Sequence, residues 1–527
     1  MFLRYSLFRK KKIVIYLLIL AAFSTFINYY YANLGVFPPD SFCHFDNGFR
    51  ILLGEHPFKD YWVVSGPIID YLQAIFFYVF GVSWNSYLIH ASVFNLILTV
   101  ATFILLRKFN LSINLSFFYS LLFSILAYTS SGTPFPDHHS AFFSLLGVYS
   151  LILAIKSENK IHWFLFPILF AFAFFSKQVP SSYIIIFVLL ILFLFSILQK
   201  NFLWIKYSAT STISLILIIL IFGKTQNINL SSFFEQYIYY PQTIGQSRIE
   251  NLNLTFNGVI AHFKFIYIVA IPFVYFNLKN IFSRKNYFKE KDFLYFLSFL
   301  LLTFSLIFHQ LLTKNQTFIF FLIPILAAFS HISLQAKKLK LNRNFSIFLI
   351  AICLFSTFKY HLRFNEERKF HELNYVNFNL AIKGEKIDKK LSGIKWISPQ
   401  YSTNPDKEVN LINDIKNHII MDKRSKMVMT HYLFFSTILN EKLLQPSRWL
   451  LSDGTTHPLK ENKYYPNYKN LLLDIIKKNE VKVIYVVDSV AKFNIYHYLD
   501  KECYVEKRIN EILNIYELKS CKEINDI

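Results

Sequence analysis

Long apolar runs separated by short polar stretches dominate the first 360 residues of the chain. A helix rises about 1.5 Å per residue, so a run of about 20 residues crosses a hydrocarbon layer of about 30 Å. Eleven runs are close enough to this length to be spans: residues 13–32, 86–106, 111–128, 140–155, 161–176, 181–199, 207–222, 258–277, 293–311, 316–334 and 344–360. The shorter run 67–81 begins at Gly66 and ends at Gly81, so we expect an interfacial helix there.

The pattern changes after residue 360. Residues 409–420 and 468–480 place apolar side chains at helical spacing, and the second of these runs leads into the apolar string VKVIYVVD. Further strands are expected at 426–433, at 447–453 and as a pair around 503–519. The sequence therefore predicts a membrane domain, residues 1–360, followed by an α/β domain, residues 361–527.

Composition supports membrane insertion. The chain is 54% apolar and only 17% charged, whereas an average soluble domain is about 25% charged. The net charge of +22 does not indicate nucleic-acid binding, because most of the excess lies before residue 361, where 28 Lys and Arg face 11 Asp and Glu.

The positive charges alternate between loops. Basic residues follow every second span, at 107–108, 156–160, 200–206, 279–291 and 337–343, and they also precede the first span. Cytoplasmic loops carry such an excess of Lys and Arg. We therefore expect a cytoplasmic N-terminus, a periplasmic C-terminal domain and a bacterial inner-membrane location. The first span is too long for a cleaved secretion signal.

The loop that follows the first span, residues 33–85, holds five of those 11 acids and is long enough for two interfacial helices. Its segment PPDSFCHFDNGFRILLGEHPFKDYWVVSGPIIDYLQAIFFYVFG places Asp40 ten residues before the string RILLGEHPFKD; G-P follows, and F-G closes the segment.

This order of motifs resembles the first outer loop of the GT-C glycosyltransferases. These polyprenyl-phosphate-sugar-dependent membrane enzymes include the protein mannosyltransferases and aminoarabinose transferases. That family tends to show an Asp, often followed by Glu, ten residues before the Arg of R-[IV]-L-x-G-E-x-P-[YF]-[RK]-D. G-P or P-P then opens a second interfacial helix, which closes with F-G. The present chain departs from this at Ser41, where Glu is frequent. The resemblance implies a GT-C fold and an inverting transfer of a sugar from a lipid phosphate to an acceptor on the outer side.

Such a transfer needs a carboxylate that accepts the proton of the acceptor, and cations or a metal for the departing phosphate. Asp40 is the expected base, and Asp46 is a second candidate that could replace the missing Glu. Each has a structural alternative: Asp40 as a helix cap after two prolines, and Asp46 as the start of an Asp-Asn-Gly turn.

The segment SSGTPFPDHHS, residues 130–140, contains one acid, Asp137. Related enzymes place an acid of this loop near a metal or the donor phosphate. Asp137 and His138 are therefore candidate ligands for Mg²⁺ or Mn²⁺; the adjacent His139 is a further candidate, although neighbouring His residues rarely bind the same ion. The alternative is a helix start capped by Asp137.

Three cations break the positive-inside trend on the outer side, namely Lys177, Arg248 and Lys314. Charged side chains at such positions often have a function, so these three are candidates for binding the donor phosphate. The alternative for the two lysines is snorkelling at a helix end.

The C-terminal domain offers two further expectations. The string RWLLSDGTTHP at 448–458 brings Arg448, Asp453 and His457 to a turn, which predicts either contact with the acceptor or only an Asp-Gly turn. Cys503 and Cys521 flank the expected strand pair in a compartment where disulfides persist. They are either bridged or two free thiols, depending on strand register.

Taken together, these features predict a membrane glycosyltransferase with a polyprenyl-phosphate-sugar donor and a lipid, glycan or protein acceptor. One rival is a non-enzymatic transporter or flippase of lipid-linked sugars, which would more often carry ionisable groups in the middle of the membrane. Another is a ligase or polymerase of surface polysaccharide, which shares much of the chemistry.

Overall fold

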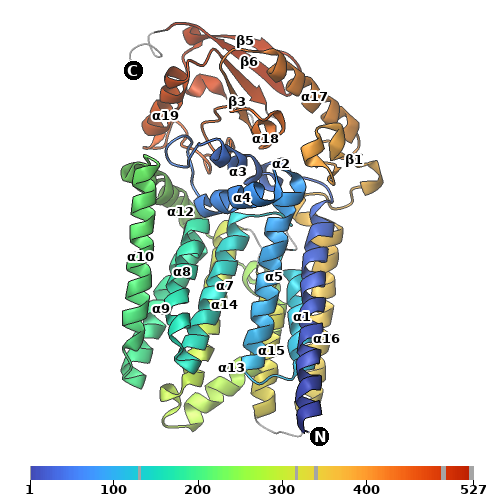
Figure 1. Cartoon of the computed structure of the whole chain (residues 1–527), viewed down its shortest axis with the longest axis vertical. Coiled ribbons are helices and arrows are strands. Elements are labelled where there is room, and N and C mark those ends of the chain that lie inside the picture. Colours follow the sequence, from blue (N-terminus) through green and yellow to red (C-terminus); the bar gives the residue numbers. More distant parts are fainter. Residues whose placement is uncertain (1, 129–131, 315–318, 337–341, 488–493, 522–527) are drawn as a thin grey trace.

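The computed structural model describes residues 2–128, 132–314, 319–336, 342–487 and 494–521. They form three layers along the long axis of the molecule (Figure 1). A helical bundle carries the N-terminus at its free end. A thin layer of short helices covers the opposite end of the bundle, and a C-terminal α/β region lies beyond that layer.

All eleven predicted apolar runs contain a helix. The bundle helices are α1 (Phe2–Ala32), α5 (Trp84–Lys108), α6 (Ile113–Leu126), α7 (Pro136–Ser157), α8 (Lys160–Ser176), α9 (Gln178–Gln199), α10 (Leu203–Thr225), α13 (Lys264–Ser283), α14 (Lys291–Thr313), α15 (Leu322–Ala336) and α16 (Asn342–His361). Within the described residues, eight of these are long and apolar enough to cross a membrane: α1, α5, α7, α9, α10, α13, α14 and α16. The chain is therefore a polytopic helical membrane protein. Crossing by the shorter α6, α8 and α15 stays a prediction.

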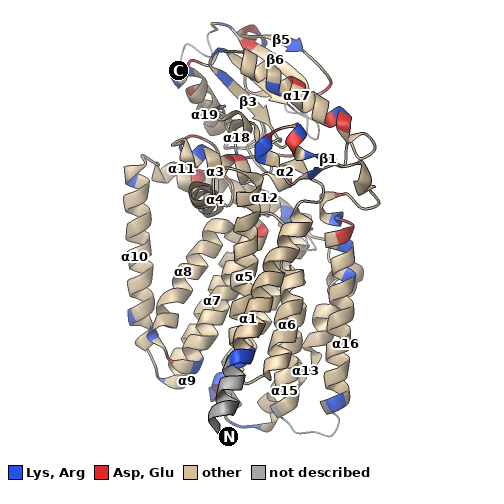
Figure 2. Cartoon of the chain, turned by 45° about the vertical axis from the view of Figure 1, so that its right-hand side comes forward, with Lys and Arg blue, Asp and Glu red and all other residues tan. Residues whose placement is uncertain are grey.

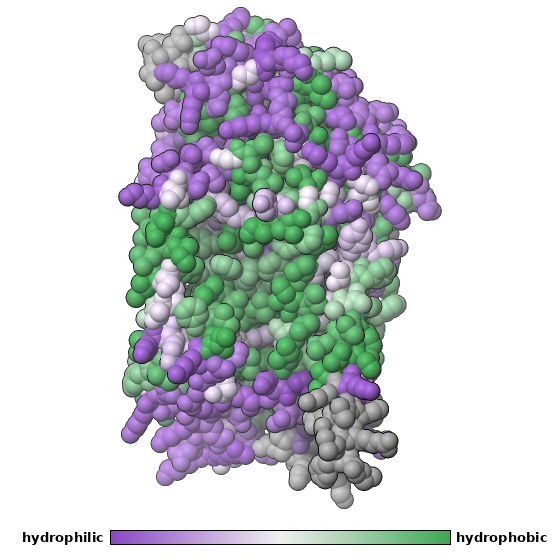
Figure 3. Space-filling view, viewed as in Figure 1, coloured by the Kyte–Doolittle hydropathy of each residue, from purple (hydrophilic) through white to green (hydrophobic). Residues whose placement is uncertain are grey.

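The surface of the bundle fits a bilayer. Hydrophobic residues cover the middle of the bundle, and hydrophilic residues gather at both of its ends and over the C-terminal region (Figure 3). Positions of Lys and Arg, marked blue on the ribbon, gather at the end of the bundle that carries the N-terminus (Figure 2). This agrees with the loop pattern above, while the side of the membrane that this end faces stays a prediction.

Short helices form the middle layer. They are α2 (Pro38–Ser41), α3 (Phe45–Leu52), α4 (Pro67–Phe80), α11 (Leu230–Phe234) and α12 (Tyr240–Glu250). As expected for residues 67–81, α4 lies across the end of the bundle instead of running along it (Figure 1). Gly66 and Gly81 flank α4 with φ values of +66° and +81°, a conformation that L side chains rarely adopt.

The C-terminal region has the predicted α/β character. Its elements are β1 (Ile382–Lys383), β2 (Lys395–Trp396), α17 (Pro405–Met421), β3 (Lys426–Thr430), α18 (Phe435–Leu439), α19 (Tyr465–Lys478), β4 (Val483–Val487), β5 (Tyr504–Arg508) and β6 (Leu513–Leu518). The main sheet has the order β3-β4-β6-β5, with β3 and β4 parallel and the other pairs antiparallel. Alternate residues of β3 and β4 pack toward α17 on one face and toward α19 on the other, so these two strands are buried throughout.

Loop 33–85 shares a hydrophobic core with the C-terminal region. Phe42 of the loop contacts Trp396 and Phe434, with ring centroids 5.8 and 5.0 Å apart. The same cluster includes Val428 of β3 and Ile412 of α17. The loop is therefore packed against the C-terminal region, although about 300 residues of sequence separate the two.

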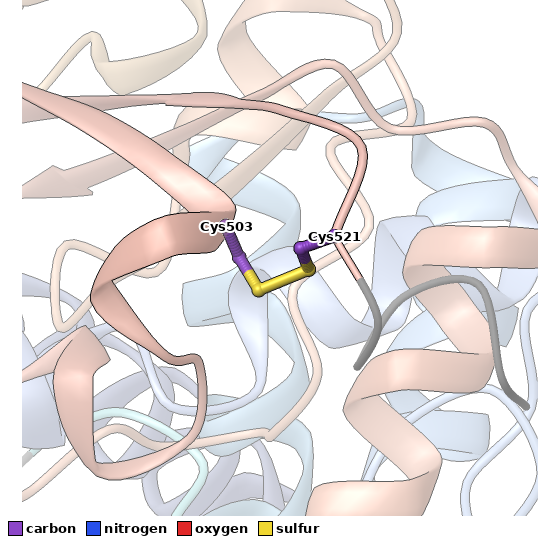
Figure 4. Close-up of a disulfide and its surroundings, with 2 residues drawn as sticks. All are labelled: Cys503 and Cys521. Carbon is purple, nitrogen blue, oxygen red and sulfur yellow. A yellow bond between two sulfur atoms is a disulfide. The ribbon is translucent and has the colours of Figure 1, made fainter.

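Two further predictions for the C-terminal region can be compared with the structure, the strand at 447–453, which is wrong, and the disulfide, which is present. Residues 447–453 form no strand and instead run beside Trp62, with a single bridge to Ser447. Cys503 and Cys521 are joined by a disulfide, with their Cα atoms 5.1 Å apart (Figure 4). Antiparallel pairing of β5 with β6 brings the two cysteines together, as the hairpin prediction requires.

Candidate active site

Asp40 is the third residue of α2, within the layer that covers the bundle. Phe37, not Asp40, is the N-cap residue of this helix, so the capping alternative is wrong. The backbone of Phe37 bonds to two residues of α2. Its N–H donates to Ser41 Oγ at 3.0 Å, and its carbonyl accepts from the Asp40 N–H at 3.0 Å. The backbone of α2 is thus satisfied without the Asp40 carboxylate.

The Asp40 carboxylate is distinguished by what it lacks. Loop 33–85 contains five acids. Four of them have partners: Asp46 accepts from Ser436 and Thr437, Glu55 from Arg50, Asp60 from the His56 N–H, and Asp70 from His44 and Arg448. Within the described residues, no side-chain hydrogen bond or ion pair reaches the carboxylate of Asp40.

The surroundings of Asp40 oppose its ionisation. Burial is the main cause and raises the pKa of Asp40 to about 7, with further contributions from the negative charges of Asp137 and Glu372. Lys177 acts in the opposite direction. A carboxyl group with a pKa near neutrality can both accept and release a proton at physiological pH, which suits a general base.

Asp137, Lys177 and His309 form a second polar group, of which Asp137 and Lys177 are close enough to Asp40 for charge interaction. Asp137 is the second residue of α7, Lys177 lies between α8 and α9, and His309 is near the end of α14. Lys177 Nζ donates to Oδ1 and Oδ2 of Asp137, at 2.9 and 2.7 Å, and His309 Nε2 lies 2.9 Å from Oδ1. Asp137 and His309 are buried, while Lys177 is 18% exposed.

Lys177 keeps part of its binding capacity. An ammonium group carries three N–H donors, and two of those on Lys177 are directed at Asp137. Gln178 fixes the neighbouring backbone by donating to the carbonyls of Val64 and Tyr237 at 2.7 and 2.6 Å. Lys177 is therefore a held cation that can still donate to an anion.

The other two predicted cations are placed differently. Arg248 lies in the last turn of α12 and is partly exposed, near enough to His309 for their charges to interact. Lys314 follows α14 and is exposed. The structure thus brings Lys177 into the site and Arg248 to its edge, and it leaves Lys314 outside.

The predicted metal ligands do not fit a divalent cation as they stand. Both oxygens of Asp137 face the ammonium group of Lys177, which would repel such an ion. His138 packs among rings, with Tyr128 and Phe142 at 5.0 and 5.6 Å, and His139 lies 3.2 Å from His90 through their Nε2 atoms. The described residues contain no group of three or more His, Cys, Asp or Glu side chains that could hold a metal.

Asp46 links two parts of the fold. Its carboxylate accepts from Thr437 N at 2.7 Å, Thr437 Oγ1 at 2.6 Å and Ser436 N at 3.3 Å, and these residues belong to the first turn of α18. The side chain is 6% exposed. These contacts favour a structural role for Asp46 as the cap of α18.

The predicted acceptor residues at 448–458 do not form one group. Arg448 is buried and paired with Asp70 at 2.7 Å, and Asp453 is an exposed turn residue that accepts from Thr455 N at 3.0 Å. His457 is buried beside Tyr468, with ring centroids 5.1 Å apart.

Sequence reasoning missed His309 and Glu372. His309 is a titratable residue near the C-terminal end of a mostly apolar span, and that position was a usable signal. Glu372 follows the last span in an irregular segment and carried no motif. No protein-family model and no curated protein matches this chain.

Proposed function

We propose that the chain is an integral membrane glycosyltransferase of GT-C architecture. It would move a sugar from a polyprenyl-phosphate donor to a lipid, glycan or protein acceptor at the end of the bundle that faces the C-terminal region. The observation that carries this proposal is the carboxylate of Asp40, which has no side-chain partner among the described residues and a pKa of about 7, together with the held cation Lys177, whose charge acts on it. Its place in a motif that resembles GT-C enzymes supports the same function.

In the proposed reaction, an acceptor hydroxyl gives its proton to the Asp40 carboxylate as its oxygen bonds to the anomeric carbon of the sugar. The bond from that carbon to the phosphate oxygen breaks, and the electron pair leaves with the lipid phosphate. The attack comes from the face opposite the phosphate, so the configuration inverts. Lys177 and Arg248 stabilise the negative charge of the departing phosphate, and Asp137 and His309 hold Lys177 in place.

The membrane arrangement is part of the proposal. Eleven spans would place the N-terminus in the cytoplasm and the C-terminal region in the periplasm of a bacterial inner membrane. The gathering of Lys and Arg at the N-terminal end of the bundle supports this orientation. A polyprenyl chain would then enter the site from the outer leaflet.

Two measurements test the function. Mass spectrometry of surface glycans and lipid-linked sugars from a deletion strain should find one glycan unit lost and one polyprenyl-phosphate sugar accumulated. Purified protein should release polyprenyl phosphate from a polyprenyl-phosphate hexose or pentose in the presence of envelope extract, and Asp40→Asn should abolish that release. Wild-type release by Asp40→Asn would refute the assignment of the base. We expect release to persist in EDTA, because Asp137 is held by Lys177 and not free for a metal.

A flippase remains the rival from another class. Its substrate would cross the membrane with the phosphate–sugar bond intact, so proteoliposomes would translocate the donor without releasing polyprenyl phosphate. Bond cleavage in the same vesicles would exclude a flippase. A polysaccharide ligase or polymerase shares the chemistry and would be recognised by the size of the transferred glycan.

A further inference from the structure

A short segment of the C-terminal region, residues 445–449, runs along loop 33–85. Arg50 Nη2 donates to the Gln445 carbonyl at 2.9 Å. The backbone N–H of Trp62 donates to the Pro446 carbonyl at 2.9 Å, and the backbone carbonyl of Trp62 accepts from the Arg448 N–H at 3.1 Å. These contacts join segment 445–449 to the loop that carries Asp40.

A buried ion pair fixes this segment in place. Arg448 Nη2 lies 2.7 Å from Asp70 Oδ2, and His44 Nδ1 lies 2.6 Å from Asp70 Oδ1. Arg448 also donates to the Ser65 carbonyl, and all three charged or titratable side chains are at most 2% exposed. A Cβ atom on Gly66 would approach His44 Cε1 to 2.8 Å and Arg448 Nη1 to 2.9 Å, so the packing around the pair has no spare room.

The residue after Arg448 reaches the candidate base. Trp449 Nε1 donates to the Pro39 carbonyl at 2.8 Å. That carbonyl belongs to the same planar peptide group as the Asp40 N–H, which donates to the Phe37 carbonyl at 3.0 Å. The peptide that precedes Asp40 is therefore held from both sides, once from within loop 33–85 and once from the C-terminal region.

We propose that Trp449 is a positioning residue for Asp40: its indole N–H fixes the peptide between residues 39 and 40 and so sets where the carboxylate of Asp40 points. The inference rests on the proposed function, in which Asp40 is the base. It makes the C-terminal region part of the catalytic arrangement. The reason is geometric, since α2 bonds this peptide only through its N–H, which donates to Phe37, while Trp449 holds its carbonyl.

The test compares Trp449→Phe with Trp62→Phe. Both changes remove an indole N–H and shrink the ring, but within the described residues the Nε1 atom of Trp62 has no hydrogen-bond partner. Trp62→Phe is therefore a control for lost ring volume. Displacement of a reacting group by about 1 Å can cost about a hundredfold in rate, so with the hexose or pentose donor Trp449→Phe should lower kcat by roughly tenfold or more. The KM for the donor should change by less than about twofold, because the phosphate-binding cations are untouched.

The pH profile adds a readout that a merely structural role would not move. Loosening of Asp40 toward water should shift the acid limb of kcat/KM to lower pH in Trp449→Phe and leave it unchanged in Trp62→Phe. A second readout needs no activity. At about pH 8, Asp40→Asn should raise the free energy of unfolding, and this gain should be roughly half as large when Trp449→Phe is also present. Equal kcat values for the two Trp variants would overturn the inference. So would a Trp449→Phe variant in which both the acid limb of kcat/KM and the stability gained by Asp40→Asn are unchanged. An inactive Asp40→Asn beside a fully active Trp449→Phe would reject this inference alone, whereas a fully active Asp40→Asn would reject the proposed base and the inference with it.

Discussion

Replacing Asp40 by Asn should abolish transfer and at the same time stabilise the protein at alkaline pH. The pKa of Asp40 rises from an ordinary 3.8 to about 7 in the folded chain. Between these two values the folded state binds a proton that the unfolded state has released. The stability linked to this proton is present below about pH 4 and is lost as the pH rises through about 7.

The size of the effect follows from the shift. Each pKa unit corresponds to about 1.4 kcal/mol, so a shift of roughly three units sets an upper limit of about 4 kcal/mol. Part of the Asp40 surface is exposed, so water reduces the penalty and we expect about 1–3 kcal/mol. Asn has nearly the same shape and stays neutral at every pH. At about pH 8 it should therefore stabilise the fold by that amount, and at about pH 4 the difference should vanish.

The assay is denaturant unfolding of the detergent-solubilised protein, followed by tryptophan fluorescence at about pH 8 and about pH 4. Asp46→Asn is the matched control, because Asp46 accepts three hydrogen bonds from the start of α18. The side-chain amide in this variant would direct N–H groups at the donors of α18. The free energy of unfolding of Asp46→Asn should therefore fall by about 1–3 kcal/mol at about pH 8. An Asp40→Asn variant that is less stable than wild type at about pH 8 would show that Asp40 is a structural residue and refute the reasoning.

Asp137→Asn or Lys177→Met alone should lower the free energy of unfolding by about 3–5 kcal/mol, because each change leaves the other partner of the ion pair uncompensated. The double variant should be more stable than either single one, and additive losses would show that the pair is uncoupled. For the bridge between Cys503 and Cys521, mass spectrometry of the denatured, unreduced protein should find both residues closed to thiol reagents. Cys503→Ser should lower stability by about 3 kcal/mol, whereas labelling of both cysteines without reductant would refute the bridge.

The helical part of the fold could be predicted because the bilayer demands long apolar runs and the sequence supplies them without interruption. The helices α17 and α19 and the strands β3 to β6 followed from periodicity for a similar reason, since each presents one regular apolar pattern. The strand predicted at 447–453 failed because its backbone groups bond to Trp62 in loop 33–85 and not to a neighbouring strand. Periodicity reports which side chains are buried but not which partner receives the backbone hydrogen bonds.

The candidate site was predictable residue by residue but not as an assembly. Asp40 stood out by its place ten residues before the string RILLGEHPFKD, and Asp137 and Lys177 stood out as charged residues at the edge of an apolar run. Their proximity depends on how α2, α7 and the junction between α8 and α9 pack, and no local pattern encodes that. Asp46 misled for the same reason, because its partners in α18 lie 390 and 391 positions away in sequence.

The contrast between Asp40 and the other acids of loop 33–85 explains why so much of this loop is acidic. Asp46, Glu55 and Asp70 each accept hydrogen bonds from cations or from a helix start, and all three also tie the loop to the C-terminal region, Glu55 through an ion pair with Lys442. Such paired acids hold the loop rigid. A rigid loop can keep one carboxylate half-buried and without a side-chain partner, although that arrangement is unfavourable by itself. Groups held at such a cost are typical of functional sites. The paired acids therefore explain how the fold tolerates Asp40. That no described side chain bonds to its carboxylate supports the proposal that Asp40 accepts a proton.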